Sequence, residues 1–186
     1  MDRVFLIGFM GAGKTTIGKA LAQIINYRFF DIDDLIEQKT GKTISDIFDK
    51  NNEEEFRKFE QQALKEIINE KEIVVATGGG TPCFNNNLEL IKQAGISVYL
   101  KQPSLMLYYR LRNSKDEYPL LKDVSYSELM PYINKLLRKR KPFYKQADII
   151  IQYNSSPVEE ITQKLLEELY SLGLRIAPPT TSSNAE

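Results

Sequence analysis

Short apolar runs alternate along this chain with longer segments in which apolar residues recur every three or four positions. The short runs have the length of buried strands and predict strands over residues 4–7, 28–31, 73–76, 97–100 and 148–152. The longer segments predict helices over residues 15–25, 34–40, 44–49, 53–69, 87–94, 104–112, 125–145 and 157–172. Strands that alternate with helices indicate an α/β three-layer sandwich, in which helices cover both faces of a parallel sheet.

Polar or glycine-rich segments follow most of the predicted strands. In a parallel α/β sheet, ligands bind beyond the carboxyl ends of the strands, so we expect these segments to meet at one site. The helices between the second and third strands predict an insertion over about residues 33–69, and the polar segment at about 112–124 is either a lid or an ordinary surface loop. We expect one domain over residues 1–176 and a disordered tail over 177–186, which is rich in Pro, Thr and Ser.

Residues 8–15 read G-F-M-G-A-G-K-T between the first predicted strand and the first predicted helix. This spacing at a strand–helix joint is typical of a phosphate-binding loop, and a chance match is the less favoured interpretation. Glycines let backbone N–H groups surround an anion, and the helix N-terminus adds partial positive charge. Lys14 can reach the outer phosphates and Thr15 can ligate Mg²⁺. The segment therefore predicts binding of a nucleoside triphosphate.

Composition removes several classes of function. Lys and Arg together number 25, as do Asp and Glu, so we expect neither nucleic acid nor a membrane as a partner. The chain has no histidine, which excludes Ser-His-Asp hydrolysis and His-ligated zinc but not phosphoryl transfer. Cys83 is the one cysteine, and we interpret it as an apolar filler in a reducing compartment. No signal peptide is expected before the first strand, so we expect a cytoplasmic protein.

Two carboxylates, Asp31 and Asp33, follow the second predicted strand. On a continuing strand both would point to the same side, so one could hold the water shell of Mg²⁺ while the other contacts an acceptor hydroxyl. In the alternative interpretation, Asp33 or Asp34 only caps the following helix. These residues alone leave both interpretations open.

Arg57 and Glu60 lie three positions apart on a predicted helix and can form an ion pair. The pair is either a surface ion pair of little energetic weight, or one in which Glu60 orients Arg57 to receive a carboxylate. Phe48 and Phe56 could wall a small pocket, although core packing is the usual role of phenylalanine. The basic run at residues 138–141 either stabilises a helix C-terminus or binds an anionic group opposite Arg57.

Three consecutive glycines, Gly78, Gly79 and Gly80, follow the third predicted strand. A run of glycines is costly to order. A flexible turn is one explanation, but we favour a backbone that passes very close to a ligand.

Together these segments resemble the shikimate kinase family. The resemblance extends from residue 4 to about residue 172 and includes G-F-M-G-A-G-K-T-T-I-G, F-D-I-D, E-F-R-K-F-E, T-G-G-G, P-L-L and R-K-R-K-P-F-Y in that order. Many kinases share the phosphate loop, whereas its combination with D-x-D, F-R-x-x-E and G-G-G is specific to this family. The resemblance implies a five-stranded P-loop NTPase fold of the nucleoside monophosphate kinase type. It also implies a monomer that uses ATP and Mg²⁺ to phosphorylate the 3-hydroxyl of shikimate, a step of aromatic amino-acid biosynthesis.

The resemblance assigns roles to individual residues. It implies that Lys14 and Asp33 are catalytic, that Thr15 ligates Mg²⁺ and that Asp31 contacts the ion through water. It implies that ATP is bound by Gly11, Ala12, Gly13, Lys14, Thr15, Thr16, Arg110 and Pro157, the last two enclosing adenine. It implies that shikimate is bound by Asp33, Arg57, Gly78, Gly79, Gly80 and Arg140, with both arginines on the carboxylate.

One position departs from the family pattern. The family has an arginine just before the lid proline, where this chain has Tyr118, and a tyrosine cannot neutralise charge in the transition state. Lys115 or Arg112, in the same polar segment, is a candidate replacement. Two alternatives remain open from the sequence: another small-molecule kinase such as gluconate kinase, or a non-catalytic ATP-binding switch.

Overall fold

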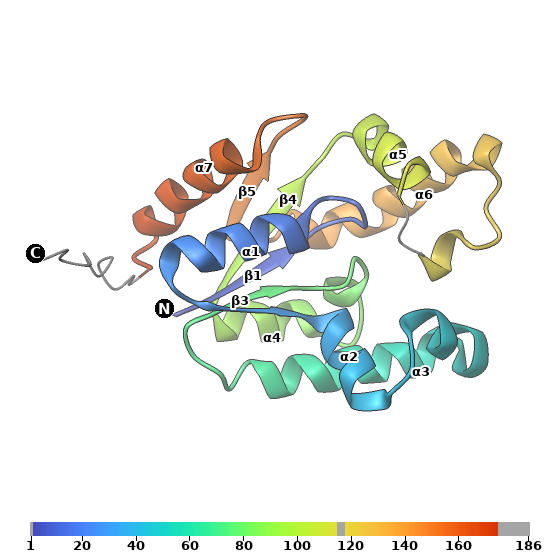
Figure 1. The fold of residues 1–186 in the computed structure, drawn as a ribbon, viewed down its shortest axis with the longest axis horizontal. Helices are drawn as coiled ribbons and strands as arrows, with labels where there is room; N and C mark the ends of the chain where they lie inside the picture. Colours follow the sequence, from blue (N-terminus) through green and yellow to red (C-terminus); the bar gives the residue numbers. More distant parts are fainter. Residues whose placement is uncertain (1, 115–117, 175–186) are drawn as a thin grey trace, which may run out of the picture.

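The computed structural model describes residues 2–114 and 118–174, with the backbone alone at residues 49–52. Five parallel strands form one sheet in the order β2-β3-β1-β4-β5 (Figure 1). The strands are β1 (Arg3–Ile7), β2 (Arg28–Asp31), β3 (Ile73–Ala76), β4 (Ile96–Lys101) and β5 (Ile149–Gln152). This sheet confirms the α/β fold and the five strands predicted from the apolar runs, with small shifts at the ends.

The central strand, β1, lies between β3 and β4. The four apolar residues that follow Arg3 are fully buried, because helices cover both faces of the sheet. The chain leaves β1 toward β2 and β3 on one side and later builds β4 and β5 on the other side. The carboxyl end of β1 is therefore the topological switch point, which is where open α/β sheets bind their ligands.

Helices α1 (Lys14–Ile25) and α7 (Val158–Ser171) pack against each other on one face of the sheet. On the other face lie α4 (Asn87–Ala94) and α6 (Tyr126–Tyr144), and α5 (Ser104–Arg112) packs against α6 (Figure 1). Within residues 2–114 and 118–174, no helix is both long and apolar enough to cross a membrane.

Between β2 and β3 the chain forms two helices instead of the three predicted. Helix α2 (Ile32–Thr40) ends at Gly41, and α3 (Ile44–Ile67) runs without a break through the polar residues at 50–52, where we expected one. The expectation rested on the apolar periodicity, which the polar residues at 50–52 interrupt. A capping box of Thr43 and Asp46 fixes the start of α3. Helices α2 and α3 pack together.

The described part of the predicted lid holds one 3₁₀ turn, Pro119–Leu121, which packs against α3. Residues 115–117 lie outside the described residues, as does the tail at 177–186. The lid and the disordered tail therefore stay predictions.

Candidate active site

Three glycines with positive φ shape the loop between β1 and α1. Gly8, Gly11 and Gly13 have φ angles of 147°, 74° and 81°, which residues with a Cβ rarely adopt. A Cβ added to Gly8 would also lie 2.8 Å from the carbonyl oxygen of Leu100. The sequence therefore fixes a tight loop that leads directly into the N-terminus of α1 at Lys14.

Lys14 is buried within this loop. Its Nζ donates hydrogen bonds to the carbonyl oxygens of Gly8 (3.1 Å) and Phe9 (3.0 Å). Burial lowers the pKa of Lys14 to about 8, while the carboxylates of Asp31 and Asp33 act in the opposite direction. The side chain therefore carries positive charge at pH 7 at the place where a terminal phosphate would lie.

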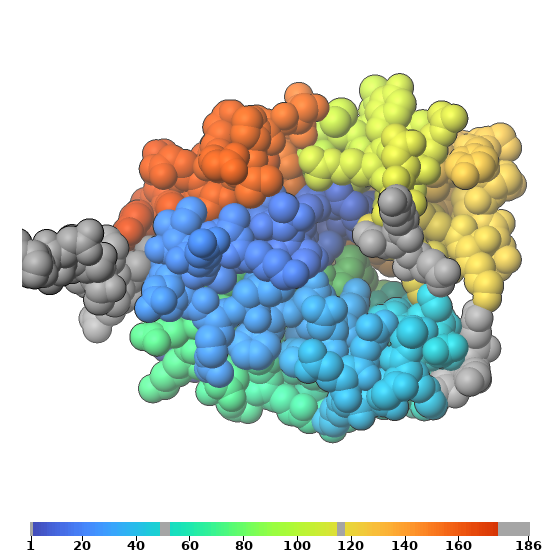
Figure 2. All heavy atoms as spheres, in the orientation of Figure 1, coloured from blue at the N-terminus to red at the C-terminus, as the bar shows by residue number. Residues whose placement is uncertain are grey.

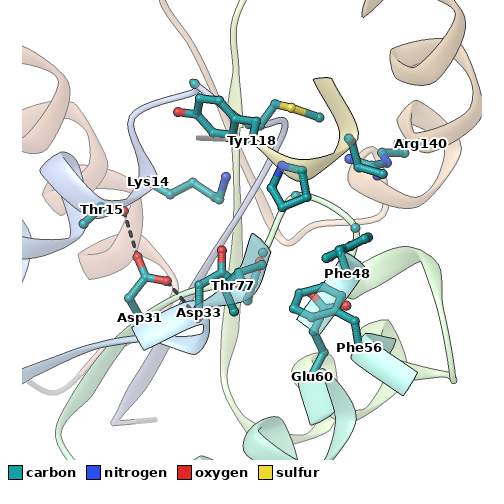
Figure 3. Close-up of a pocket in the computed structure, with 18 of the residues that line it drawn as sticks. Lys14, Thr15, Asp31, Asp33, Phe48, Phe56, Glu60, Thr77, Tyr118 and Arg140 are labelled. Atoms are coloured by element: carbon teal, nitrogen blue, oxygen red, sulfur yellow. Dashed lines mark hydrogen bonds between the residues drawn. The ribbon is translucent and has the colours of Figure 1, made fainter. Parts of the chain in front are cut away.

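Asp31 connects the phosphate loop to α2. Its Oδ2 accepts a hydrogen bond of 2.8 Å from Thr15 Oγ1, and its Oδ1 accepts one of 3.1 Å from the backbone N–H of Asp33 (Figure 3). Asp31 is thus the N-cap of α2, so the alternative interpretation, in which Asp33 or Asp34 only caps this helix, is wrong. The expected continuing strand is also wrong, because β2 ends at Asp31 and α2 begins with the next residue.

Asp33 lies in the first turn of α2, and its carboxylate faces the cavity. Figure 3 shows Asp33 near Lys14, between the phosphate loop and a wall formed by Phe48, Phe56 and Glu60. The Oδ1 atom of Asp33 is buried and has no hydrogen-bond partner among the described residues. Burial, with the charges of Asp31 and Glu60, raises the pKa of Asp33 to about 7. A carboxylate in this state can accept a hydrogen bond or a proton from a bound hydroxyl.

Arg57 forms part of the opposite wall of the cavity, and only 5% of it is exposed. Its Nη1 donates to the fully buried Glu60, whose other oxygen accepts a hydrogen bond of 2.5 Å from Thr81 Oγ1. The guanidinium also lies 4.3 Å from the centroid of the Phe84 ring and 5.1 Å from that of Phe56. The pair of Arg57 and Glu60 is therefore buried, and it is not the surface ion pair that was the alternative interpretation.

A second guanidinium, that of Arg140 in α6, reaches the same cavity and is 4% exposed. It lies 5.7 Å from the centroid of the Phe9 ring, next to the phosphate loop. The basic run at 138–141 is therefore divided, because Arg140 is buried whereas Arg138, Lys139 and Lys141 are exposed.

Two of the three glycines after β3, Gly78 and Gly80, are required by side chains of the site itself. A Cβ at Gly78 would lie 2.5 Å from a carboxylate oxygen of Glu60, and a Cβ at Gly80 would lie 2.6 Å from Nη1 of Arg57. None of the three has a positive φ, so close approach is the reason for glycine here. The three glycines also line the cavity, and the expected close approach of this backbone to a ligand stays a prediction.

These residues enclose a cavity of about 370 Å³, which opens between the cyan start of α3 and the yellow segment of α5 and α6 (Figure 2). The cavity gathers most of the site residues named from the sequence: Gly11, Gly13, Lys14, Thr15, Thr16, Asp31, Asp33, Arg57, Gly78, Gly79, Gly80, Arg110 and Arg140. Ala12 and Pro157 do not line it. Ala12 accepts a hydrogen bond from Tyr153 through its carbonyl oxygen, and Pro157 is the N-cap of α7.

Comparisons with known proteins agree with this geometry. A family model described as shikimate kinase matches residues 10–170. The chain belongs to the shikimate kinase family. A shikimate kinase from Azobacteroides pseudotrichonymphae is 46% identical over 170 residues, which cover 91% of this chain and 100% of that protein. The structure of a shikimate kinase from Acinetobacter baumannii in complex with shikimate superposes with a TM-score of 0.87 at 38% identity, covering 94% of this chain and 96% of that one.

A gluconokinase from Sinorhizobium meliloti is also similar in structure, with a TM-score of 0.56 at 17% identity over 92% of this chain and 93% of that one. Similarity at that level shows a shared fold alone. It therefore gives no support to the gluconate kinase alternative beyond the common architecture.

In this shikimate kinase family member, Tyr118 lines the cavity together with Pro119 and Leu120. Arg112, one candidate replacement for the family arginine, does not line the cavity, and its guanidinium lies 5.9 Å from the centroid of the Tyr126 ring. Lys115, the other candidate, lies outside the described residues. Arg110 does line the cavity, and its Nη1 donates a hydrogen bond of 3.2 Å to the carbonyl oxygen of Gly11.

Sequence reasoning missed Glu53 and Thr81, whose side chains hydrogen-bond to Arg57 and Glu60 respectively in one wall of the cavity. Glu53 lies four positions before Arg57, a helical spacing that was available as a signal. Thr81 lies 21 positions after Glu60, and nothing in the sequence indicates that their side chains meet.

Proposed function

We propose that this protein transfers the γ-phosphoryl group of ATP to the 3-hydroxyl of shikimate, giving shikimate 3-phosphate and ADP. The observation that carries the proposal is a single cavity in which Lys14 and Thr15 face Asp33, with Arg57 and Arg140 on its walls. Shikimate is a small acid with several hydroxyls, so a pair of arginines and a buried carboxylate are the groups that complement it.

The phosphate loop and Lys14 would hold the triphosphate at the N-terminus of α1. Arg57 and Arg140 would hold the carboxylate of shikimate and so fix its ring within the cavity. In this arrangement the acceptor hydroxyl lies between Asp33 and the γ-phosphorus. Alignment and charge neutralisation are what the loose transition state of phosphoryl transfer requires.

Asp33 accepts the hydrogen bond of the acceptor hydroxyl. As the new O–P bond forms and the bond to the β-phosphate oxygen breaks, the hydroxyl proton passes to Asp33 and later to solvent. A pKa of about 7 suits a group that must accept and release a proton near neutral pH.

Thr15 and Asp31 offer a hydroxyl and a carboxylate oxygen, the ligand chemistry that Mg²⁺ prefers. The ion is proposed to lie at Thr15 with Asp31 orienting one of its waters, and when bound it would supply positive charge to the phosphate oxygens. Because Asp31 Oδ2 already accepts a hydrogen bond from Thr15, the two groups are oriented before the ion arrives.

We also propose that the protein works as a monomer in the cytoplasm, where ATP is available and where a single free thiol such as Cys83 persists. Light scattering at micromolar concentration would test the monomer, because a dimer would double the measured mass.

A coupled assay of ADP release, with and without shikimate, tests the function. We expect release that depends on both shikimate and Mg²⁺, and a product whose mass is that of shikimate plus one phosphate group. ATP binding without shikimate-dependent release would instead support the non-catalytic switch. Faster turnover of gluconate than of shikimate would support the other small-molecule kinase.

A further inference from the structure

Two protein carboxylates hold the guanidinium of Arg57. Glu60 accepts from Nη1, while Oε1 of Glu53 accepts from both Nε (3.2 Å) and Nη2 (2.7 Å). The edge formed by Nε and Nη2 is one along which arginine receives a carboxylate through two parallel hydrogen bonds. In this structure, therefore, a carboxylate of the chain itself occupies that edge.

The two acidic partners of Arg57 differ in their surroundings. Glu60 is fully buried and is held by Thr81 as well as by Arg57. The side chain of Glu53 is 47% exposed, so it can leave Arg57 and be solvated without a large loss. Glu60 is thus a permanent partner, whereas Glu53 is the one that an incoming anion can displace.

Glu53 does not itself line the cavity, but it contacts Arg57, which does. Burial raises the pKa of Tyr132 in α6, the charge of Arg140 lowers it, and the charge of Glu53 raises it. Tyr132 is therefore within electrostatic reach of both Arg140, one proposed carboxylate receptor, and Glu53, which is bound to the other. The ion pair of 2.7 Å with Arg57 places Glu53 next to one of the two arginines that are proposed to bind the carboxylate.

We propose that Glu53 is a specificity-determining residue that competes with the substrate carboxylate for Arg57. This inference rests on the proposed function, in which Arg57 binds the acidic group of the acceptor. Before substrate binds, Glu53 satisfies the guanidinium. An acidic acceptor displaces Glu53 into solvent, whereas an uncharged polyol leaves it on Arg57. Glu53 therefore lowers the affinity of the protein for an acidic acceptor. It also leaves Arg57 only when the ligand carries a negative charge.

The variants Glu53→Gln and Glu54→Gln give a matched pair for the test. Glu54 is also exposed and pairs with Lys58 at 3.0 Å with the same spacing of four residues, but it does not contact Arg57. We expect Glu53→Gln to lower both the KM and the calorimetric Kd for shikimate by roughly two- to fivefold, with the change falling on these constants and not on kcat. Glu54→Gln should leave both constants at the wild-type values.

An uncharged ligand completes the test. The methyl ester of shikimate has no charge with which to displace Glu53, so Glu53→Gln should not tighten its binding. A KM for shikimate that is unchanged or raised in Glu53→Gln, with the wild type active, would overturn the inference and would mark Glu53 as a support for Arg57. Failure of the wild type to phosphorylate shikimate would overturn the proposed function, and the inference with it.

Discussion

Thr15 Oγ1 and Asp31 Oδ2 are joined by a hydrogen bond of 2.8 Å that links the start of α1 to the end of β2. The same carboxylate caps α2 through its other oxygen. One side chain thus fixes the phosphate loop relative to the helix that carries Asp33. The position of the proposed metal ligand and that of the proposed base are therefore set by a common residue.

The variant Asp31→Asn tests this role in metal binding. Because the neutral amide would orient a metal-bound water less well, we expect the Mg²⁺ concentration for half-maximal activity to rise roughly 10- to 100-fold. A titration of activity with Mg²⁺ at saturating ATP and shikimate measures it. Asp34→Asn, an exposed carboxylate in the same turn of α2, is the control and should match the wild type. Identical Mg²⁺ titrations for Asp31→Asn and the wild type would contradict the assignment.

The raised pKa of Asp33 predicts how the reaction depends on pH. A base must be deprotonated to work, and the pKa of this carboxyl is raised to about 7, so the free enzyme is mostly protonated there below that pH. We expect kcat/KM for shikimate to rise with pH and to level off above about 7. Asp33→Asn should remove this rise of kcat/KM with pH. It should also lower kcat by roughly 10²- to 10⁴-fold, with a much smaller effect on ATP binding. Equal losses in kcat and in ATP affinity would argue against a role on the acceptor side.

Thr81 should act on shikimate binding through Glu60 and Arg57. Thr81→Val keeps the shape but leaves a buried oxygen of Glu60 without its donor, at a cost of about 1–3 kcal/mol in the free energy of unfolding. We expect the KM for shikimate to rise severalfold with little change in the KM for ATP, because the guanidinium loses its fixed position. Thr81→Ser restores the hydroxyl and should recover both stability and KM. If the serine variant behaves like the valine variant, the hydroxyl is not the cause.

Gly80→Ala tests the crowding around Arg57 directly. The added Cβ would lie 2.6 Å from Nη1, so Arg57 must move, and we expect the KM for shikimate to rise roughly 10- to 100-fold. Gly41→Ala is the control: it adds a Cβ in open space at a φ of 66°, which should cost about 1 kcal/mol of stability without changing KM. Denaturant unfolding of both variants measures the loss of stability from backbone strain. Steady-state kinetics measure the effect of moving the Arg57 guanidinium. An unchanged KM in Gly80→Ala would show that Arg57 can shift without loss.

Arg110 and Arg112 differ in their relation to the cavity, although both lie in the last turn of α5. Arg110 lines the cavity and bonds to Gly11, so Arg110→Ala should raise the KM for ATP roughly tenfold. Arg112 lies over Tyr126, so Arg112→Ala should leave the KM for ATP and kcat within about twofold of the wild type. A larger effect from Arg112→Ala would mean that this arginine takes the place of the family arginine that is absent at Tyr118.

Local patterns were sufficient to predict the sheet and the phosphate loop. The apolar runs predicted the strands because a parallel strand is buried on both faces. The phosphate loop could be recognised because its glycines and Lys14 lie close together in the sequence. The break expected near residue 51 was wrong, since the packing of α3 and its N-terminal cap outweigh the weak helix propensity of a few polar residues.

The wall of the cavity that carries Arg57 was harder to predict from the sequence because distant segments build it. The contact of Thr81 with Glu60, and the approach of Gly80 to Arg57, join the loop after β3 to α3 and depend on the packing of the whole insertion. The capping role of Asp31 was also missed, because a residue that ends a strand and starts a helix has no separate signature. By contrast, the pairing of Glu53 with Arg57 follows from helical spacing alone.

The buried Oδ1 of Asp33 affects the stability of the protein without substrate. The pKa of this carboxyl is about 7 in the folded state and 3.8 as a reference value, so between those values the folded state binds the extra proton. The free energy of unfolding therefore falls as pH rises through that window, and above pH 7 the chain carries an ionised group that weakens its own fold. A substrate hydroxyl that donates to this oxygen would offset the penalty from Asp33, so the acceptor substrate should add most to the free energy of unfolding when this carboxyl is ionised.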